Sequence, residues 1–127
     1  MTVRSGTIAR RRALFEEAAS LIDREFAQAL ELDAVARRLA TSRRQLQRAF
    51  TETSGVSFRT FVAQVRMQKA LELLRQGDMP VRDVANAVGY RQPAQFAKTF
   101  RRHHGAPPSS FRGGDGSSAA EQHPVAV

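Results

Sequence analysis

The chain has 127 residues, and its 20 lysine and arginine residues outnumber its 12 aspartate and glutamate residues, giving a net charge of +8. This balance favours a polyanionic partner, which means nucleic acid or an anionic membrane surface. The absence of cysteine excludes disulfides, thiol nucleophiles and thiolate metal sites. No apolar run approaches the roughly 18 residues of a membrane span. Glu16 and Glu17 interrupt the segment where a signal peptide would need its apolar core, so we expect a cytoplasmic protein.

The two ends of the chain differ from its middle. We expect residues 1–6 to be a flexible start. Residues 113–127, with the sequence GGDGSSAAEQHPVAV, have no periodicity, two acids and no bases, which predicts a disordered tail. The positive charge therefore lies on the part that folds. Met1 and such a tail favour a complete, stand-alone protein over an excised domain.

Three helices are predicted in the first half of the chain. Apolar residues recur at three- and four-residue steps over residues 7–26, beginning with Ile8, which indicates a long helix with one apolar face. A short helix follows over residues 32–40. Ser42 is then a good N-cap for a third helix over residues 43–53.

Three more helices are predicted in the second half. An apolar stripe over residues 57–76 indicates a long helix, which Gly77 and Pro80 terminate. Shorter helices follow over residues 81–88 and 93–103, the second opening on a proline suited to a first helical turn. No segment shows sustained two-residue alternation, so the predicted fold is all-α.

The chain also repeats itself. At an offset of 50 residues, QLQRAFTETSG aligns with QFAKTFRRHHG, so that Phe50 falls on Phe100 and Gly55 on Gly105. Each copy has a small alanine where two helices would cross, an apolar residue before a tight turn, and an apolar anchor in the second helix. This is the pattern of a helix-turn-helix. The residues are Ala36, Leu39 and Leu46 in the first copy, and Ala85, Val88 and Phe96 in the second.

The organisation predicted from these observations is two small subdomains on a shared helix. We expect a first helix-turn-helix subdomain at residues 7–56, a linker helix at 57–76 and a second helix-turn-helix subdomain at 77–112. A linker of about 20 residues is about 30 Å long at 1.5 Å per residue. That length is close to the roughly 34–36 Å that separates successive major-groove segments of B-DNA.

The two helix-turn-helix patterns, in this order along the chain, make it resemble the DNA-binding domain of the AraC family of bacterial transcription regulators. The match runs over most of the expected folded part and closes with GAPPSSFR, which is similar to the family's Gly-x-x-Pro-x-x-aromatic-Arg signature. The other matching residues are Ala36, Ser42, Leu46, Arg48, Phe50, Gly55, Phe61, Arg66, Ala70, Leu74, Val84, Ala85, Gly89, Tyr90, Phe96, Phe100 and Arg101.

The resemblance implies that two recognition helices enter successive major-groove segments on one face of double-stranded DNA. One monomer would then suffice, and its site would be asymmetric. The resemblance also implies an activator that contacts RNA polymerase. Many relatives carry a separate effector or dimerisation domain, for which 127 residues leave no room.

In the first recognition helix, the resemblance puts Arg44, Gln47 and Arg48 at base-reading positions. Arginine suits the O6 and N7 atoms of guanine, and glutamine suits the N6 and N7 atoms of adenine. The alternative is that these arginines contact phosphate alone, which positions the protein without reading sequence. Ser42 and Arg43 are candidates for phosphate contact, and Ser42 is also the expected N-cap.

In the second recognition helix, Gln95 and Lys98 are the main candidates for base reading. Pro93 and Ala94 also match groove-facing positions, but their side chains cannot donate hydrogen bonds and could only touch a thymine methyl. This half is therefore expected to contribute more affinity than specificity. The phosphate-contact candidates here are Arg91, Gln92, Arg101 and Arg102.

No constellation indicates an enzyme. His103 and His104 are adjacent, which is the wrong spacing for a metal site on one helix face, and we expect them to form a frayed helix end. The sequence shows no set of nucleophile, base and orienting residue, so no catalytic activity, metal or cofactor is predicted. Two other functions remain open: a protein-interaction adaptor that keeps the fold without reading DNA, and a non-specific nucleic-acid binder.

Overall fold

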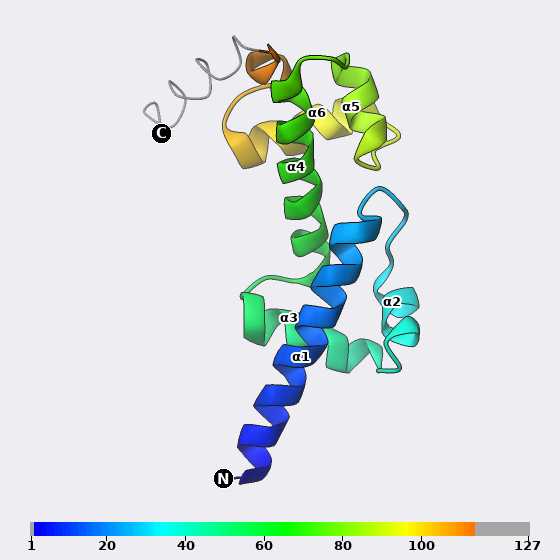
Figure 1. Ribbon diagram of the computed structural model, residues 1–127, viewed down its shortest axis with the longest axis vertical. Helices are drawn as coiled ribbons and strands as arrows, with labels where there is room; N and C mark the ends of the chain where they lie inside the picture. Colours follow the sequence, from blue (N-terminus) through cyan, green and yellow to red (C-terminus); the bar gives the residue numbers. More distant parts are fainter. Residues whose placement is uncertain (1, 114–127) are drawn as a thin grey trace. The chain divides into compact units, whose positions relative to one another are not determined.

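The computed structural model describes residues 2–113 and, within them, contains helices and no strand (Figure 1). The prediction of an all-α fold is therefore confirmed. The predicted tail lies outside the described residues except for Gly113. The helices are α1 (Thr2–Glu25), α2 (Leu32–Arg38), α3 (Arg43–Ser54), α4 (Phe58–Gln76), α5 (Val81–Ala87), α6 (Pro93–His104) and the 3-10 helix η1 (Pro108–Phe111).

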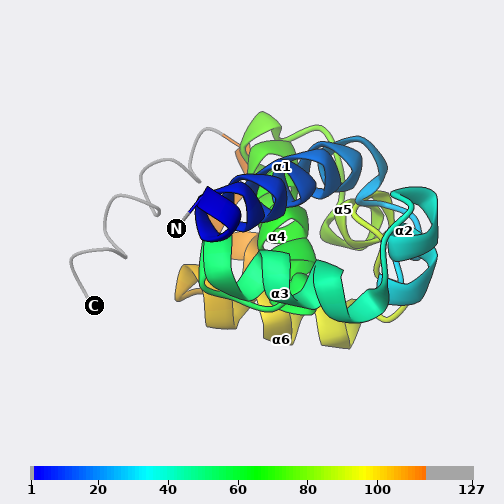
Figure 2. The same cartoon turned by 90° about the horizontal axis from the view of Figure 1, so that it is seen from below.

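The chain divides into two compact units, Met1–Ala63 and Gln64–Val127, and the division falls within α4. The first unit contains α1 and the helix-turn-helix pair α2–α3. In it α1 crosses α3, while α2 lies against the N-terminal part of α3 (Figures 1 and 2). The second unit contains the pair α5–α6, with η1 packed on α6. The two helix-turn-helix pairs predicted from the repeat are both present.

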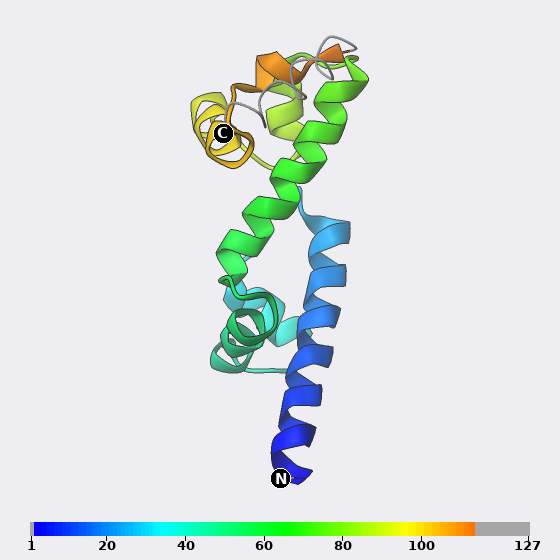
Figure 3. The same ribbon diagram turned by 90° about the vertical axis from the view of Figure 1, so that its left-hand side faces the viewer.

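The N-terminal helix is longer than predicted and is less buried at its start. It begins at Thr2, so residues 2–6, which were expected to belong to a flexible start, are helical. They include no proline, and Gly6 alone disfavours a helix by only about 1 kcal/mol. Ile8 was expected on the apolar face, but it is 54% exposed. Ile8 borders an open hollow beside Glu52 and Thr53 of α3. The first turns of α1 extend beyond α3 (Figure 3).

Four phenylalanine rings form the centre of the first unit. Phe50 of α3 is fully buried, and its ring centroid lies 5.0 Å from Phe15, 5.4 Å from Phe58 and 5.3 Å from Phe61, all edge-on. Edge-to-face rings at this spacing stabilise a core beyond the area they bury. This cluster fixes the rotation of α3 and therefore decides which of its residues face outward.

An aromatic cluster also holds the second unit together. Phe100 of α6 is fully buried, with ring centroids 5.7 Å from Phe96 and 5.5 Å from Phe111. His104 corrects an expectation: it packs 4.5 Å from Phe100, and its Nε2 lies 3.1 Å from the Met67 carbonyl oxygen. The helix end is therefore anchored by the imidazole instead of frayed.

The turn between the two helices has the same hydrogen bonds in both units. In the first, the Thr41 N–H donates to the Ala36 carbonyl at 2.9 Å; in the second, the Tyr90 N–H donates to the Ala85 carbonyl at 2.9 Å. Both turns need a left-handed residue, which is Gly89 (φ 97°) in the second unit. In the first unit Ala40 takes this role with φ 55°, so α2 ends at Arg38, short of the predicted end at residue 40.

This difference predicts opposite effects of exchanging alanine and glycine. Ala40→Gly should raise the free energy of unfolding by about 0.5–1 kcal/mol, because glycine adopts a positive φ without the clash at Cβ. Gly89→Ala should lower it by about 1 kcal/mol for the same reason. Denaturant unfolding followed by circular dichroism measures both. A less stable Ala40→Gly variant would contradict a strained alanine at this turn.

Candidate nucleic-acid interface

The first recognition helix, α3, is set by a cap at its start and by three buried anchors. The Ser42 hydroxyl oxygen accepts a hydrogen bond from the Gln45 N–H at 3.1 Å, as predicted for an N-cap. Leu46, Ala49 and Phe50 are fully buried. The opposite face is therefore exposed; it carries Arg43, Arg44, Gln47, Arg48 and Thr51.

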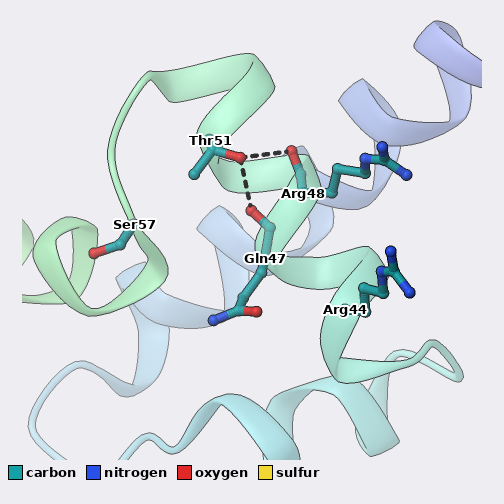
Figure 4. Close-up of a pocket in the computed structure, with 5 residues that line it drawn as sticks. All are labelled: Arg44, Gln47, Arg48, Thr51 and Ser57. Carbon is teal, nitrogen blue, oxygen red and sulfur yellow. Dashed lines mark hydrogen bonds between the residues drawn. The ribbon is translucent and has the colours of Figure 1, made fainter.

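All of these exposed residues except Arg43 border a shallow hollow on the first unit. It is lined by Arg44, Gln47, Arg48, Thr51 and Ser57 (Figure 4). The guanidinium groups of Arg44 and Arg48 extend to one side of the helix, and the amide of Gln47 extends to another (Figure 4). The Thr51 hydroxyl donates to the carbonyl oxygens of Gln47 and Arg48 at 3.2 and 3.3 Å. The three predicted base-reading residues thus lie on one exposed surface.

Two of the residues around the hollow were not predicted as site residues. Thr51 faces outward one turn after Gln47, and its position on the helix was the signal for it. Ser57 precedes α4 and caps it, because its hydroxyl oxygen accepts from the Thr60 N–H at 3.1 Å. Its place beside α3 depends on the path of the chain between the helices.

An acidic residue also lies on this surface. Glu52 Oε2 is 3.4 Å from Arg48 Nε, and Glu52 Oε1 is 2.6 Å from Arg11 Nη1. The spacing of four residues between Arg48 and Glu52 was a signal available in the sequence. Arg43 lies 3.7 Å from Asp33 of α2. Arg44 has no ion pair among the residues that the structure describes, so its charge is fully available to a ligand.

The position of α2 is supported from the first helix. Two terminal nitrogens of Arg38 donate to the two carboxylate oxygens of Glu25 at 2.6 and 2.8 Å. The hydrogen bonds from Arg38 lower the pKa of Glu25 below its ordinary value. The carboxylate is therefore charged at neutral pH, and the pair ties α2 to the end of α1.

The second recognition helix, α6, also has one buried and one exposed face, and its own sequence contains no aspartate or glutamate. Pro93 occupies the first helical position, and Phe96 and Phe100 are fully buried. Desolvation, together with the charges of His104 and Arg102, lowers the pKa of His103 below its ordinary value. All of the predicted contact residues in this half are exposed: Arg91, Gln92, Pro93, Ala94, Gln95, Lys98, Arg101 and Arg102.

Tyr90 supports the turn that leads into α6. Its ring lies 5.7 Å from that of Phe96, and the guanidinium carbon of Arg66 lies 5.7 Å from the centroid of the Tyr90 ring. A cation above an aromatic face at this distance is attractive. Both residues belong to the second unit, so the contact holds the turn against α4.

Residues 2–113 offer no cluster of three or more histidine, cysteine, aspartate or glutamate side chains that could hold a metal ion. Over the same residues, no helix combines the length and apolar character needed to cross a membrane.

Comparison of the chain with known protein families agrees with the two helix-turn-helix pairs. The AraC-type helix-turn-helix domain family matches residues 35–114, which is more than half of the chain. This chain belongs to the AraC family. The resemblance seen in the sequence is thereby confirmed. Members of this family and the chain's relatives are DNA-binding transcription regulators and not enzymes, as the sequence predicted.

Relatives of this AraC-family chain include proteins known by sequence and by structure. The transcriptional regulator YijO of Escherichia coli is 32% identical over 106 residues, which cover 84% of this chain and 38% of YijO. The C-terminal domain of AraT, a response regulator from Geobacillus stearothermophilus, is 32% identical with a TM-score of 0.75 and covers 78% of this chain and 83% of that one. An AraC-type regulator from Chromobacterium violaceum is 26% identical with a TM-score of 0.78 and covers 89% of this chain and 97% of that one.

The chain is short beside its curated relatives. It spans 36% of the Msm operon regulatory protein of Streptococcus mutans and 38% of YijO. What it shares with them is the DNA-binding part of an AraC-type regulator.

Proposed function

We propose that the chain binds a specific, asymmetric site in double-stranded DNA, with α3 and α6 in the major groove, and activates transcription there. The observation that carries this proposal is the exposed face of α3. Arg44, Gln47 and Arg48 project from it. The opposite face of the helix is buried, where Phe50 packs against three other phenylalanine side chains. A rigid helix with two guanidinium groups and one amide has the donors needed to read guanine and adenine edges.

Phosphate contacts would orient this helix on the duplex. The Ser42 oxygen already accepts a hydrogen bond from Gln45, so its O–H remains free to donate to a phosphate. The positive end of the α3 dipole lies at the same place. Arg43 supplies a further cation, since its partner Asp33 is 3.7 Å away and both side chains are well exposed. These contacts set position and affinity, and base contacts set sequence.

The second recognition helix contributes mainly affinity. Its first turn presents Pro93 and Ala94, which offer only apolar contact, so Gln95 and Lys98 are the base readers we propose there. Phosphate contacts come from the helix start and from its last turn. The residues proposed for them are Arg91, Gln92, Arg101 and Arg102.

One chain acting as a monomer would supply both readers, which makes the site asymmetric. RNA polymerase is the protein partner that the family resemblance suggests for an activator. We place this activity in the cytoplasm, because chromosomal DNA is the proposed partner. The +8 charge of the chain suits a ligand with a phosphate backbone.

Selection of binding sites from a library of random duplexes tests this function. We expect a consensus of two short, unequal blocks about one helical turn apart, with more information in the block read by α3. Binding without any consensus would favour a non-specific nucleic-acid binder. Failure to bind DNA at all would favour a protein-interaction adaptor that has the same fold but does not read DNA.

A further inference from the structure

Glu52 lies between two arginines that come from different helices. One carboxylate oxygen is 2.6 Å from Nη1 of Arg11 on α1, and the other is 3.4 Å from Nε of Arg48 on α3. All three residues belong to the first unit. The side chains of Arg11, Glu52 and Arg48 are 22%, 45% and 52% exposed, so the group extends from the edge of the core to the surface.

The atoms used in these contacts leave Arg48 able to bind a base. Glu52 forms an ion pair with Nε of Arg48 at 3.4 Å, and the four N–H donors of the two terminal nitrogens of Arg48 make no hydrogen bond within the described residues. A pair of parallel N–H donors is what guanine O6 and N7 accept. Arg11, in turn, balances the charge of Glu52 from the protein side, so the carboxylate does not leave a net negative charge beside the DNA.

We infer that Glu52 is a positioning residue for sequence reading: it holds the guanidinium of Arg48 in place, and Arg11 holds Glu52. The inference rests on the proposed function, since it gives Arg48 a base to read. Glu52 itself does not contact DNA in this account. Its role is to fix the direction in which Arg48 projects from α3.

Two physical effects follow from this arrangement, and both favour the correct site over other DNA. A held guanidinium loses less conformational entropy when it binds a base than a free one does. The carboxylate also repels phosphate oxygens and competes for Arg48, so it opposes a swing of this side chain towards the backbone. Removing the carboxylate should therefore strengthen binding to random DNA while weakening the preference for the selected site.

The test compares Glu52→Gln with Glu16→Gln, which removes the same charge from an exposed position on α1. Binding is measured on the duplex selected from the random library, on its single-base variants and on a shuffled duplex. For Glu52→Gln we expect about a tenfold fall in the ratio of selected to shuffled affinity. Glu52→Gln and Arg48→Ala should both lose their preference for the selected base at the same position of the duplex. Glu16→Gln should leave the ratio within about twofold of the unmodified protein.

A double-mutant cycle and a melting curve exclude other roles for Glu52. In an Arg48→Ala background, Glu52→Gln should change the ratio no further, because the residue it positions is gone. An unchanged ratio with a lowered melting temperature would show a structural tie between α1 and α3 and overturn the inference. A preference lost at a different base position would show that Glu52 reads DNA itself and would also overturn it.

The second arginine gives an independent variant. Arg11→Met should weaken binding to both duplexes by about threefold or more, because Glu52 then faces the DNA without its counter-charge. It should also lower the ratio of selected to shuffled affinity, because Glu52 is no longer held beside Arg48. Equal binding by Arg11→Met and the unmodified protein would contradict the charge balance. If the unmodified protein shows no preference for any duplex, the proposed function itself fails, and this inference fails with it. A preference that Glu52→Gln leaves intact overturns the inference alone.

Discussion

Replacing Phe100 by alanine should lower the free energy of unfolding of the second unit by about 3–5 kcal/mol. The ring is fully buried and lies against Phe96, His104 and Phe111 at centroid distances of 5.7, 4.5 and 5.5 Å. Truncation to alanine removes these contacts and leaves a cavity that the short helices around it cannot easily fill. Phe100→Leu, which keeps most of the volume, should cost clearly less, about 1–1.5 kcal/mol.

The chain offers a local probe for this measurement. Tyr90 is its single tyrosine, there is no tryptophan, and the Tyr90 ring packs beside Phe96 in the same cluster. Tyrosine fluorescence during denaturant unfolding therefore reports on the second unit. An unchanged unfolding midpoint for Phe100→Ala would mean that the rotation of α6 is wrong, and with it the assignment of Gln95 and Lys98 to the outer face.

Replacing Arg48 by alanine should cost about 1–3 kcal/mol on the selected DNA site and relax the preference at one base position. The reason is that the substitution removes donors from a base edge, and a shuffled duplex does not offer the same edge. Fluorescence anisotropy with labelled duplexes measures both affinities. On the shuffled duplex we expect a much smaller loss, set by one charge.

Arg75→Ala is the matched control for this prediction. Arg75 is an exposed arginine in the last turn of α4, outside both helix-turn-helix pairs, and its removal makes the same change in net charge. It should leave the selected-to-shuffled ratio unchanged. An equal loss of affinity on both duplexes for Arg48→Ala would assign Arg48 to a phosphate and would leave Arg44 and Gln47 as the readers on α3.

Much of the fold could be predicted because the repeat fixed the register of both helix-turn-helix pairs. Leu46 and Phe96 are fully buried at matching positions, as the alignment of the two copies required. Features that depend on packing between distant segments could not be predicted in this way. Phe111 is nearly fully buried, and it lies on no helical stripe that would have indicated it. The 3-10 helix that carries Phe111 is too short to show any periodicity.

The turn in the first unit shows a different limit. Glycine marks the left-handed position in the second unit, but alanine occupies it in the first, and alanine at a positive φ carries no signal in the sequence. Only the repeat itself, which places Ala40 opposite Gly89, could have indicated this turn. The hydrogen bonds of the two turns are the same, so the backbone follows the fold and not the local residue preference.

For the interface, the sequence could predict which side chains face outward but not what they contact. The outward positions of Arg44, Gln47 and Arg48 follow from the burial of Leu46 and Phe50 alone. The contact between Arg11 and Glu52 joins residues 41 positions apart, so no helical spacing could have indicated it. This contact places a second arginine on Glu52, the ion-pair partner of Arg48.

Sequence reading by α3 and α6 is tested by the affinity of the unmodified chain for its selected duplex and for a shuffled duplex of the same composition, over a range of salt concentrations. We expect the selected duplex to bind roughly 10³-fold more tightly than the shuffled one, or better, at physiological salt. If about eight phosphates are neutralised, the logarithm of the binding constant should fall with a slope near −7 against the logarithm of the salt concentration. Equal affinity for the two duplexes at every salt concentration would contradict a sequence-reading role for α3 and α6.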